Sequence, residues 1–140
     1  MILDFSKIEE TVKTQFYGGE KQLKAHMNID KNNKILLGTL EPGASIGLHT
    51  HETNSEIIYI LSGKGKVLFE GEYELVSAGL CHYCPQGCSH SLINDSNDNL
   101  KMCIRDSLSD GSIPPNRFDT YFHTFLIVWR PVSSTPAHVL

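Results

Sequence analysis

The sequence predicts an all-β domain, a sandwich or a barrel, preceded by a short helix. From residue 23 onward, apolar and polar side chains alternate with a period of two, as in strands that bury one face. Clusters of glycine, proline, asparagine and aspartate interrupt the chain at short intervals between residues 30 and 99. Many short strands separated by regular turns are typical of sandwiches and barrels.

The N-terminal helix is expected over about residues 7–13, because Ser6-Lys7-Ile8-Glu9 has the form of a capping box. Gly18-Gly19 then breaks the chain. An alternating strand follows over residues 23–29, and a turn at residues 30–33 leads into a returning strand. The strands expected after the first one lie near residues 34–41, 46–51, 55–61, 65–70, 72–76, 80–84 and 89–94.

The strand that begins at Glu56 is apolar on both faces. Ile58 and Ile60 share a face with Glu56, and a barrel can bury that face inside itself. The opposite face carries Ile57 and Tyr59, followed by Leu61, and needs a cover, either the N-terminal segment or a second subunit. We therefore expect a homodimer.

Composition restricts the classes of function. The 140 residues suit one domain, and a net charge of −4 offers no basic surface for nucleic acid. No apolar run approaches the roughly 18 residues of a membrane span, and the first residues do not form a signal peptide. The expected location is the cytoplasm, where the four cysteines stay reduced.

Three histidines and one glutamate are spaced as metal ligands. His49 and His51 lie two apart and project from the same face of a strand. Glu56 follows on the next strand, and His90 begins a later one. Each residue alone is more often a surface or hydrogen-bonding side chain, but together they suit a borderline divalent ion.

At these residues the chain closely resembles the cupin superfamily, over roughly residues 20–100. The first cupin motif is matched by Gly43, His49, His51, Glu56 and Gly63, and the second by Gly79, Pro85, Gly87, His90 and Asn94. The resemblance implies a cupin-type jelly-roll barrel, a double-stranded β-helix. It also implies that His49, His51, Glu56 and His90 hold one divalent transition-metal ion, with Mn, Fe, Ni, Co, Cu and Zn not distinguished.

Two kinds of function follow for a metal-binding single-domain cupin. An octahedral ion keeps two positions for a bidentate small acid or enediol, whereas a tetrahedral zinc ion is fully ligated. The protein is then a metal-dependent dioxygenase, decarboxylase or isomerase acting on a small polar substrate, or a non-catalytic module that binds or senses a small ligand. An acid or base near the metal would favour the enzyme, and the candidates are His82, the tyrosines including Tyr59, and the cysteines.

Three cysteines precede His90, namely Cys81, Cys84 and Cys88. They could form a second zinc site or a redox pair. On a strand, Cys81 and Cys84 point to opposite faces about 10 Å apart, so a disulfide between them does not close. We expect them to be small buried apolar side chains.

The last part of the chain differs in composition. All three arginines lie after residue 100, and no glutamate follows Glu74. Written as codons, residues 101–107 resemble a transposase-end adapter used in sequencing libraries. We therefore expect a barrel domain over residues 1–107 and a tail over residues 108–140, with foreign sequence beginning near residue 101. The alternative is a genuine closing strand in which Met102 and Ile104 face the same way.

Overall fold

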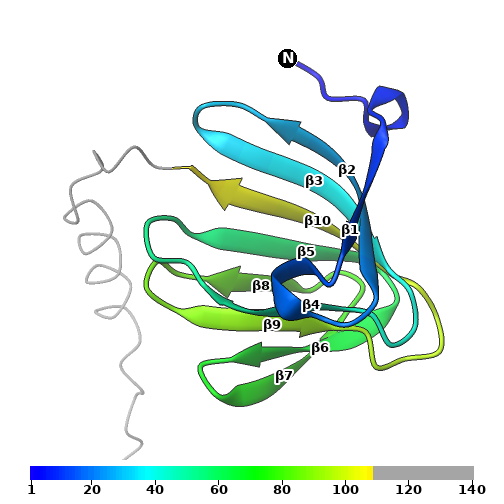
Figure 1. Ribbon diagram of the computed structural model, residues 1–140, viewed down its shortest axis with the longest axis vertical. Helices are drawn as coiled ribbons and strands as arrows, with labels where there is room; N and C mark the ends of the chain where they lie inside the picture. The colour runs from blue at the N-terminus through cyan, green and yellow to red at the C-terminus, as the bar shows by residue number, and fades with distance from the viewer. Residues whose placement is uncertain (109–140) are drawn as a thin grey trace, which may run out of the picture.

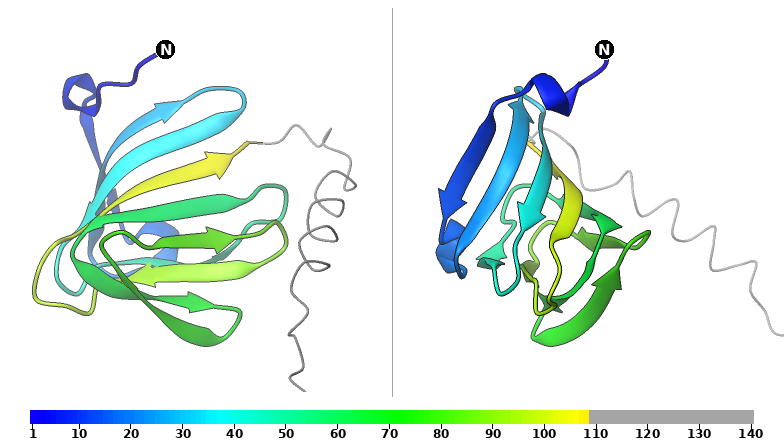
Figure 2. Two further views of the ribbon diagram at one scale, coloured as in Figure 1. Left: turned by 180° about the vertical axis from the view of Figure 1, so that it is seen from behind. Right: turned by 90° about the vertical axis from the view of Figure 1, so that its right-hand side faces the viewer.

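The computed structural model describes residues 1–108, which form two antiparallel sheets that face each other (Figure 1). One sheet has six strands in the order β1-β2-β3-β10-β5-β8, and the other has four in the order β4-β9-β6-β7. Figure 2 shows how the curved sheets enclose a common interior. The strands are β1 (Glu10–Thr14), β2 (Gln22–Ile29), β3 (Asn33–Leu40), β4 (Ser45–Thr50), β5 (Glu56–Ser62), β6 (Lys64–Phe69), β7 (Glu72–Ser77), β8 (Cys81–Cys84), β9 (Ser89–Ile93) and β10 (Leu100–Ser107). The predicted jelly-roll architecture is confirmed.

The interior is filled by every second side chain of the long strands. Leu100, Met102 and Ile104 of β10 are fully or almost fully buried, and they pack with Ile58 and Ile60 of the neighbouring β5. Burial of one such side chain is worth about 1.5–3 kcal/mol, so this alternation is what fixes the strand register.

One end of the barrel is closed by the buried side chain of Asn94. Its Nδ2 donates to the carbonyl oxygens of Leu40 and Asp98, both at 2.8 Å. Its Oδ1 accepts from the backbone N–H of Ser96 at 3.1 Å. A single amide thus joins the end of β3 to the loop before β10, which gives the asparagine of the second motif a structural role.

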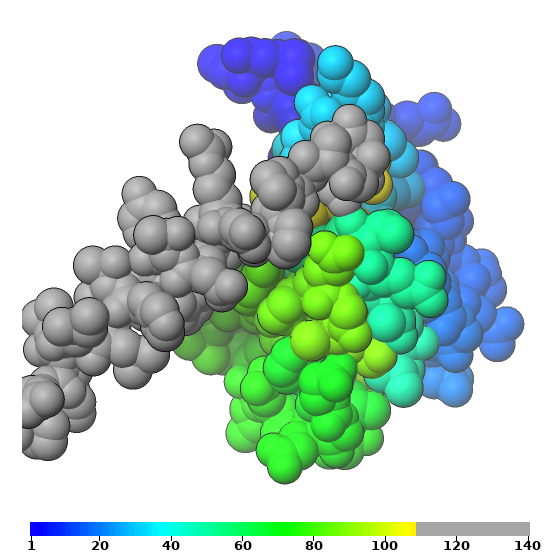
Figure 3. Space-filling view, turned by 90° about the vertical axis from the view of Figure 1, so that its left-hand side faces the viewer, coloured from blue at the N-terminus to red at the C-terminus, as the bar shows by residue number. Residues whose placement is uncertain are grey.

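The helix expected over residues 7–13 is wrong. In its place a single 3-10 turn, η1 (Phe5–Lys7), precedes the first strand, and it is capped by Asp4 rather than Ser6. Residues 10–14 instead form β1, which pairs with β2 in the register Val12 to Lys24. The backbone edge of β2 pairs with five residues of β1, and these strand hydrogen bonds outweigh a marginal helical pattern. The first residues lie at the opposite end of the molecule from the β6–β7 hairpin (Figure 3).

Residues 101–107 form part of the closing strand. β10 pairs with β3 on one side and with β5 on the other, so it lies inside the six-stranded sheet. The origin of this segment and the domain boundary near residue 107 stay predictions. Residues 109–140, and everything expected of the tail, lie outside the described residues.

The outer face of β5 is exposed in the single chain. Tyr59 is 44% exposed, and Ile57 and Leu61 are similarly accessible beside Tyr83 of β8. No described residue covers this face, so the predicted homodimer stays a prediction. Within residues 1–108, no helix is long and apolar enough to cross a membrane.

Candidate metal centre

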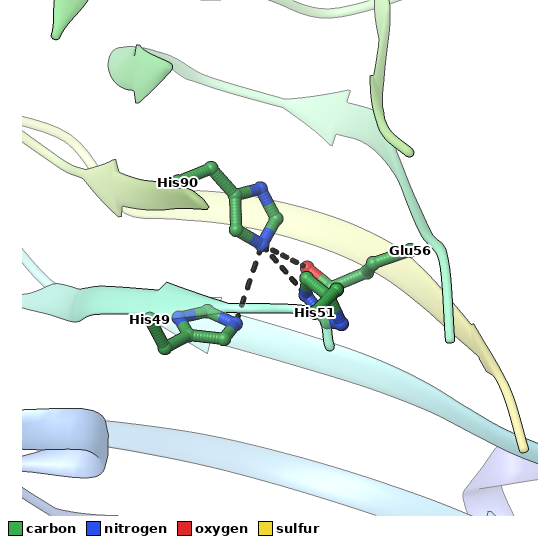
Figure 4. A group of neighbouring side chains, drawn as sticks. All are labelled: His49, His51, Glu56 and His90. Atoms are coloured by element: carbon green, nitrogen blue, oxygen red, sulfur yellow. Dashed lines mark hydrogen bonds and ion pairs between the residues drawn. The ribbon is translucent and has the colours of Figure 1, made fainter. Parts of the chain in front are cut away.

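Both sheets contribute side chains to the candidate centre. β4 and β9 pair so that His49 lies opposite His90, and His51 follows one residue after the end of β4. Glu56 is the first residue of β5, in the other sheet. The strand period turns His49 and His51 toward the same side, where they meet Glu56 and His90 (Figure 4).

The four side chains converge on one point. Nε2 of His90 lies 3.0 Å from Nε2 of His51 and 3.3 Å from Nε2 of His49. Oε1 of Glu56 is 3.2 Å from Nε2 of His90. One candidate ligand atom from each residue lies within 4.8 Å of all the others. The structure therefore brings together all four residues that the sequence singled out as ligands.

The outer nitrogens of the three rings are held by hydrogen bonds. Nδ1 of His49 donates to the carbonyl oxygen of Gly47 at 2.8 Å, and Nδ1 of His51 donates to Oδ1 of Asn54 at 3.1 Å. Nδ1 of His90 contacts Nε2 of His82 at 3.0 Å. In a neutral imidazole, a protonated Nδ1 leaves the lone pair on Nε2. For His49 and His51, the ring tautomer inferred from these partners directs that lone pair to the centre.

Burial favours the uncharged forms of two candidate ligands in the centre. Burial lowers the pKa of His90 to about 3, and the neighbouring imidazoles add to the effect. Burial also raises the pKa of Glu56 to about 10, with a further contribution from the carboxylate of Asp106. Oε1 of Glu56 is buried and accepts no hydrogen bond from the described residues. Converging lone pairs beside an unsatisfied buried carboxyl group are the surroundings that a divalent ion would stabilise.

Comparison with known proteins identifies the family of this chain. A family model described as a cupin domain matches residues 36–104. A protein of Thermotoga maritima described as an oxalate-binding protein is 42% identical over 108 residues, which cover 73% of this chain and 89% of that protein. The chain is a cupin. An uncharacterized protein of Methanocaldococcus jannaschii is 32% identical over 99 residues, covering 71% of this chain and 70% of the relative.

Solved structures agree with this assignment. The cupin superimposes on a protein described as a predicted oxalate decarboxylase from Thermotoga maritima with a TM-score of 0.73 and 29% identity, covering 78% of this chain and all of the other. It also resembles a sugar phosphate isomerase of the cupin superfamily from Silicibacter pomeroyi, with a TM-score of 0.66 and 18% identity over 78% of this chain and 76% of the other. The second likeness shows the fold alone.

A pocket of about 310 Å³ opens beside the candidate ligands of this cupin. Lys34 and Asp106 form an ion pair in its wall, and the Asp106 side chain is almost fully buried. The residues around the pocket are Tyr17, Lys34, His49, Thr50, His51, Thr53, Asn54, Asp106 and Leu108. The pocket thus presents a candidate metal site and an ion-paired lysine to any small ligand that enters.

Sequence reasoning missed Lys34 and Asp106. Asp106 lies two residues after Ile104, on the buried face of β10. The two-residue alternation of a strand could therefore have predicted that its side chain is buried. Lys34 carries no such signal, because its contact with Asp106 depends on the pairing of β3 with β10. The pocket therefore contains one of the expected acid–base candidates, a tyrosine (Tyr17), and two that were not expected, Lys34 and Asp106.

Tyr17 is held over His49 by an unusual turn. The segment η2 (Phe16–Gly18) contains Tyr17 at φ 53°, a left-handed backbone that costs a non-glycine residue free energy. The tyrosine ring stacks on the imidazole of His49 with centroids 4.1 Å apart and planes 10° apart. The turn can approach β4 this closely because Gly19 and Gly47 have no Cβ; one on Gly47 would collide with the carbonyl oxygen of Tyr17.

The other side chains that the sequence suggested for acid–base or metal chemistry lie on both faces of the sheets. His82 is buried and contacts His90, whereas Tyr59 lies on the outer surface and takes no part in the centre. Cys84 is buried and Cys81 is exposed, so the expected opposite orientation is confirmed, but the expected burial of Cys81 is wrong. All four cysteines are free, and burial raises the pKa of the Cys84 thiol to about 12, which makes it a poor nucleophile at neutral pH.

Proposed function

We propose that this cupin binds one divalent transition-metal ion through His49, His51, Glu56 and His90, and that the ion captures a small dicarboxylate such as oxalate. The observation that carries the proposal is the convergence of three Nε2 atoms and one buried carboxyl group beside a small pocket. Four protein ligands leave an octahedral ion two positions, which suit a bidentate acid. The 42% identical relative is described as binding oxalate, which supports this class of ligand.

The charges of the site suit an anion. A divalent ion and the Glu56 carboxylate leave one net positive charge, and Lys34 with Asp106 adds none. When bound, the ion polarises the carboxylate oxygens of the ligand as a Lewis acid. Lys34 is positioned in the pocket wall to attract the rest of the anion, and Tyr17 shields one side of His49 from water. A pocket of about 310 Å³ restricts the ligand to a small molecule.

Decarboxylation of the same ligand is the second candidate. A decarboxylase needs a group that exchanges a proton with the reacting carbon, and Asp106 and Lys34 lie in the pocket wall where such a group is required. The structural relative described as a predicted oxalate decarboxylase favours this possibility. Binding without turnover needs only the metal and the pocket, so it is the function that the site supports best.

The test combines metal analysis with oxalate titration. Protein purified without chelators should contain about one ion per chain and bind oxalate, and metal-stripped protein should not bind it. His51→Ala should lose most of the metal while keeping the barrel. His26→Gln is the matched control, because His26 bonds the carbonyl oxygen of Ile8 outside the centre. Equal oxalate binding with and without metal would refute the proposal, and formate release from oxalate under air would establish the decarboxylase.

A further inference from the structure

A fourth imidazole, which is buried, lies behind the three of the candidate metal centre. His82 belongs to β8 and is only 6% exposed, yet it is not one of the four converging side chains. Its Nε2 lies 3.0 Å from Nδ1 of His90, and the two rings stack with centroids 5.2 Å apart. Among residues 1–108, the structure gives Nδ1 of His90 no other hydrogen-bond partner. The orientation of His90 therefore depends on His82.

A carboxylate lies on the far side of His82. Oε2 of Glu74, on β7, is 3.5 Å from Nδ1 of His82, and the Glu74 side chain is exposed. An ionised carboxylate only accepts hydrogen bonds, so it favours the His82 tautomer that carries its proton on Nδ1. Nε2 of His82 is then an acceptor, and Nδ1 of His90 must donate to it. The lone pair of His90 is left on Nε2, the atom that faces the other ligands.

We propose that His82, oriented by Glu74, is the positioning residue that holds His90 in its metal-binding tautomer. His49 and His51 have fixed acceptors, a carbonyl and an amide oxygen. The partner of His90 is a ring that can either donate or accept, so the direction of its hydrogen bond has to be set by the next residue along the chain of contacts. Glu74 supplies that direction from the surface.

The inference deepens the proposed metal function and rests on it for its effect on affinity. Loss of a group that orients a ligating histidine typically weakens metal binding about 10- to 100-fold. His82→Leu removes the acceptor at similar volume and should show this loss. His82→Gln retains an oxygen that reaches about where Nε2 lay, so it should bind metal within a few-fold of the wild type. Glu74→Ala removes only the orienting carboxylate and should weaken binding less than His82→Leu.

The experiment uses two measurements on the full chain. Nitrogen NMR of the imidazoles in metal-free protein reports the tautomer of His90, and competition with a coloured chelator reports Zn²⁺ affinity. Wild type and His26→Gln should show His90 protonated on Nδ1 and bind Zn²⁺ equally. In His82→Leu, the fraction of that tautomer should fall together with the affinity.

The outcomes separate the two proposals. If wild type binds no Zn²⁺, the metal function fails, and the His90 tautomer in metal-free His82→Leu still decides the role of His82. If wild type binds Zn²⁺ and a folded His82→Leu keeps both affinity and tautomer, the role of His82 is refuted while the metal function stands. If His82→Leu does not fold, Glu74→Ala decides: an affinity and a tautomer equal to those of the wild type overturn the inference.

Discussion

Metal binding at neutral pH should release one proton, and the proton should come from Glu56. In the metal-free protein, burial and the Asp106 carboxylate raise the pKa of Glu56 to about 10. At pH 7 this pKa leaves about one Glu56 in a thousand ionised. A metal ligand has to be ionised, so the carboxyl group gives up its proton when the ion binds. The pKa of His90 is lowered to about 3 and that of His49 is also lowered, so these rings are already neutral and release none.

The expected magnitude follows from the same values. Ionising a group three pH units below its pKa costs about 4 kcal/mol, at 1.36 kcal/mol per unit. This cost falls as pH rises, so the logarithm of the Zn²⁺ association constant should increase by about one for each pH unit between pH 7 and 9. In acid, affinity should continue to fall.

Calorimetry in buffers of different ionisation enthalpy measures the released proton directly. Wild type should release about one proton for each Zn²⁺ bound at pH 7. Glu56→Gln should release none, and His26→Gln should behave as the wild type does. Proton release near zero, together with an affinity that does not change between pH 7 and 9, would show that Glu56 is ionised before the metal arrives and would refute this reasoning.

Three further predictions concern the scaffold. Gly47→Ala places a Cβ 2.6 Å from the backbone nitrogen of Gly19 and should destabilise the barrel by about 1–3 kcal/mol in urea unfolding; unchanged stability would contradict the close packing of the turn. Asn94→Ala leaves buried backbone groups unpaired and should cost about 1–3 kcal/mol, so a melting temperature equal to the wild type's would argue against its closing role. A chain that ends at Ser107 should keep its circular dichroism and its metal, whereas one that ends at Leu100 should lose both; loss of fold after Ser107 would make the tail part of the domain.

The four candidate ligands could be predicted because their signal is local. His49 and His51 share a strand face by parity alone, and the spacing to Glu56 and His90 matches two sequence motifs. The strands were predictable for the same reason: from β2 to β9, the expected and observed bounds differ by no more than one residue at either end.

The features that sequence reasoning missed depend on contacts between distant segments. Residues 10–14 are a strand because β2 has a free edge, and no local pattern reports that edge. Lys34 meets Asp106 only through the pairing of β3 with β10. The stacking of Tyr17 on His49 depends on a left-handed backbone conformation. A tyrosine rarely adopts this conformation, so the sequence does not predict it.

The four candidate ligands come from opposite layers of the barrel, and this gives a bound ion a mechanical role. His49 lies in β4, His51 follows one residue after β4, and His90 lies in β9. Glu56 is the first residue of β5 in the other layer. An ion held by all four ties the two layers together, much as a covalent bridge would. At the other end, the side chain of Asn94 joins its neighbouring segments by hydrogen bonds that need no ion. Chelation should therefore loosen the molecule at one end only, and amide exchange should quicken around residues 49–56 while the amides near residue 94 stay protected.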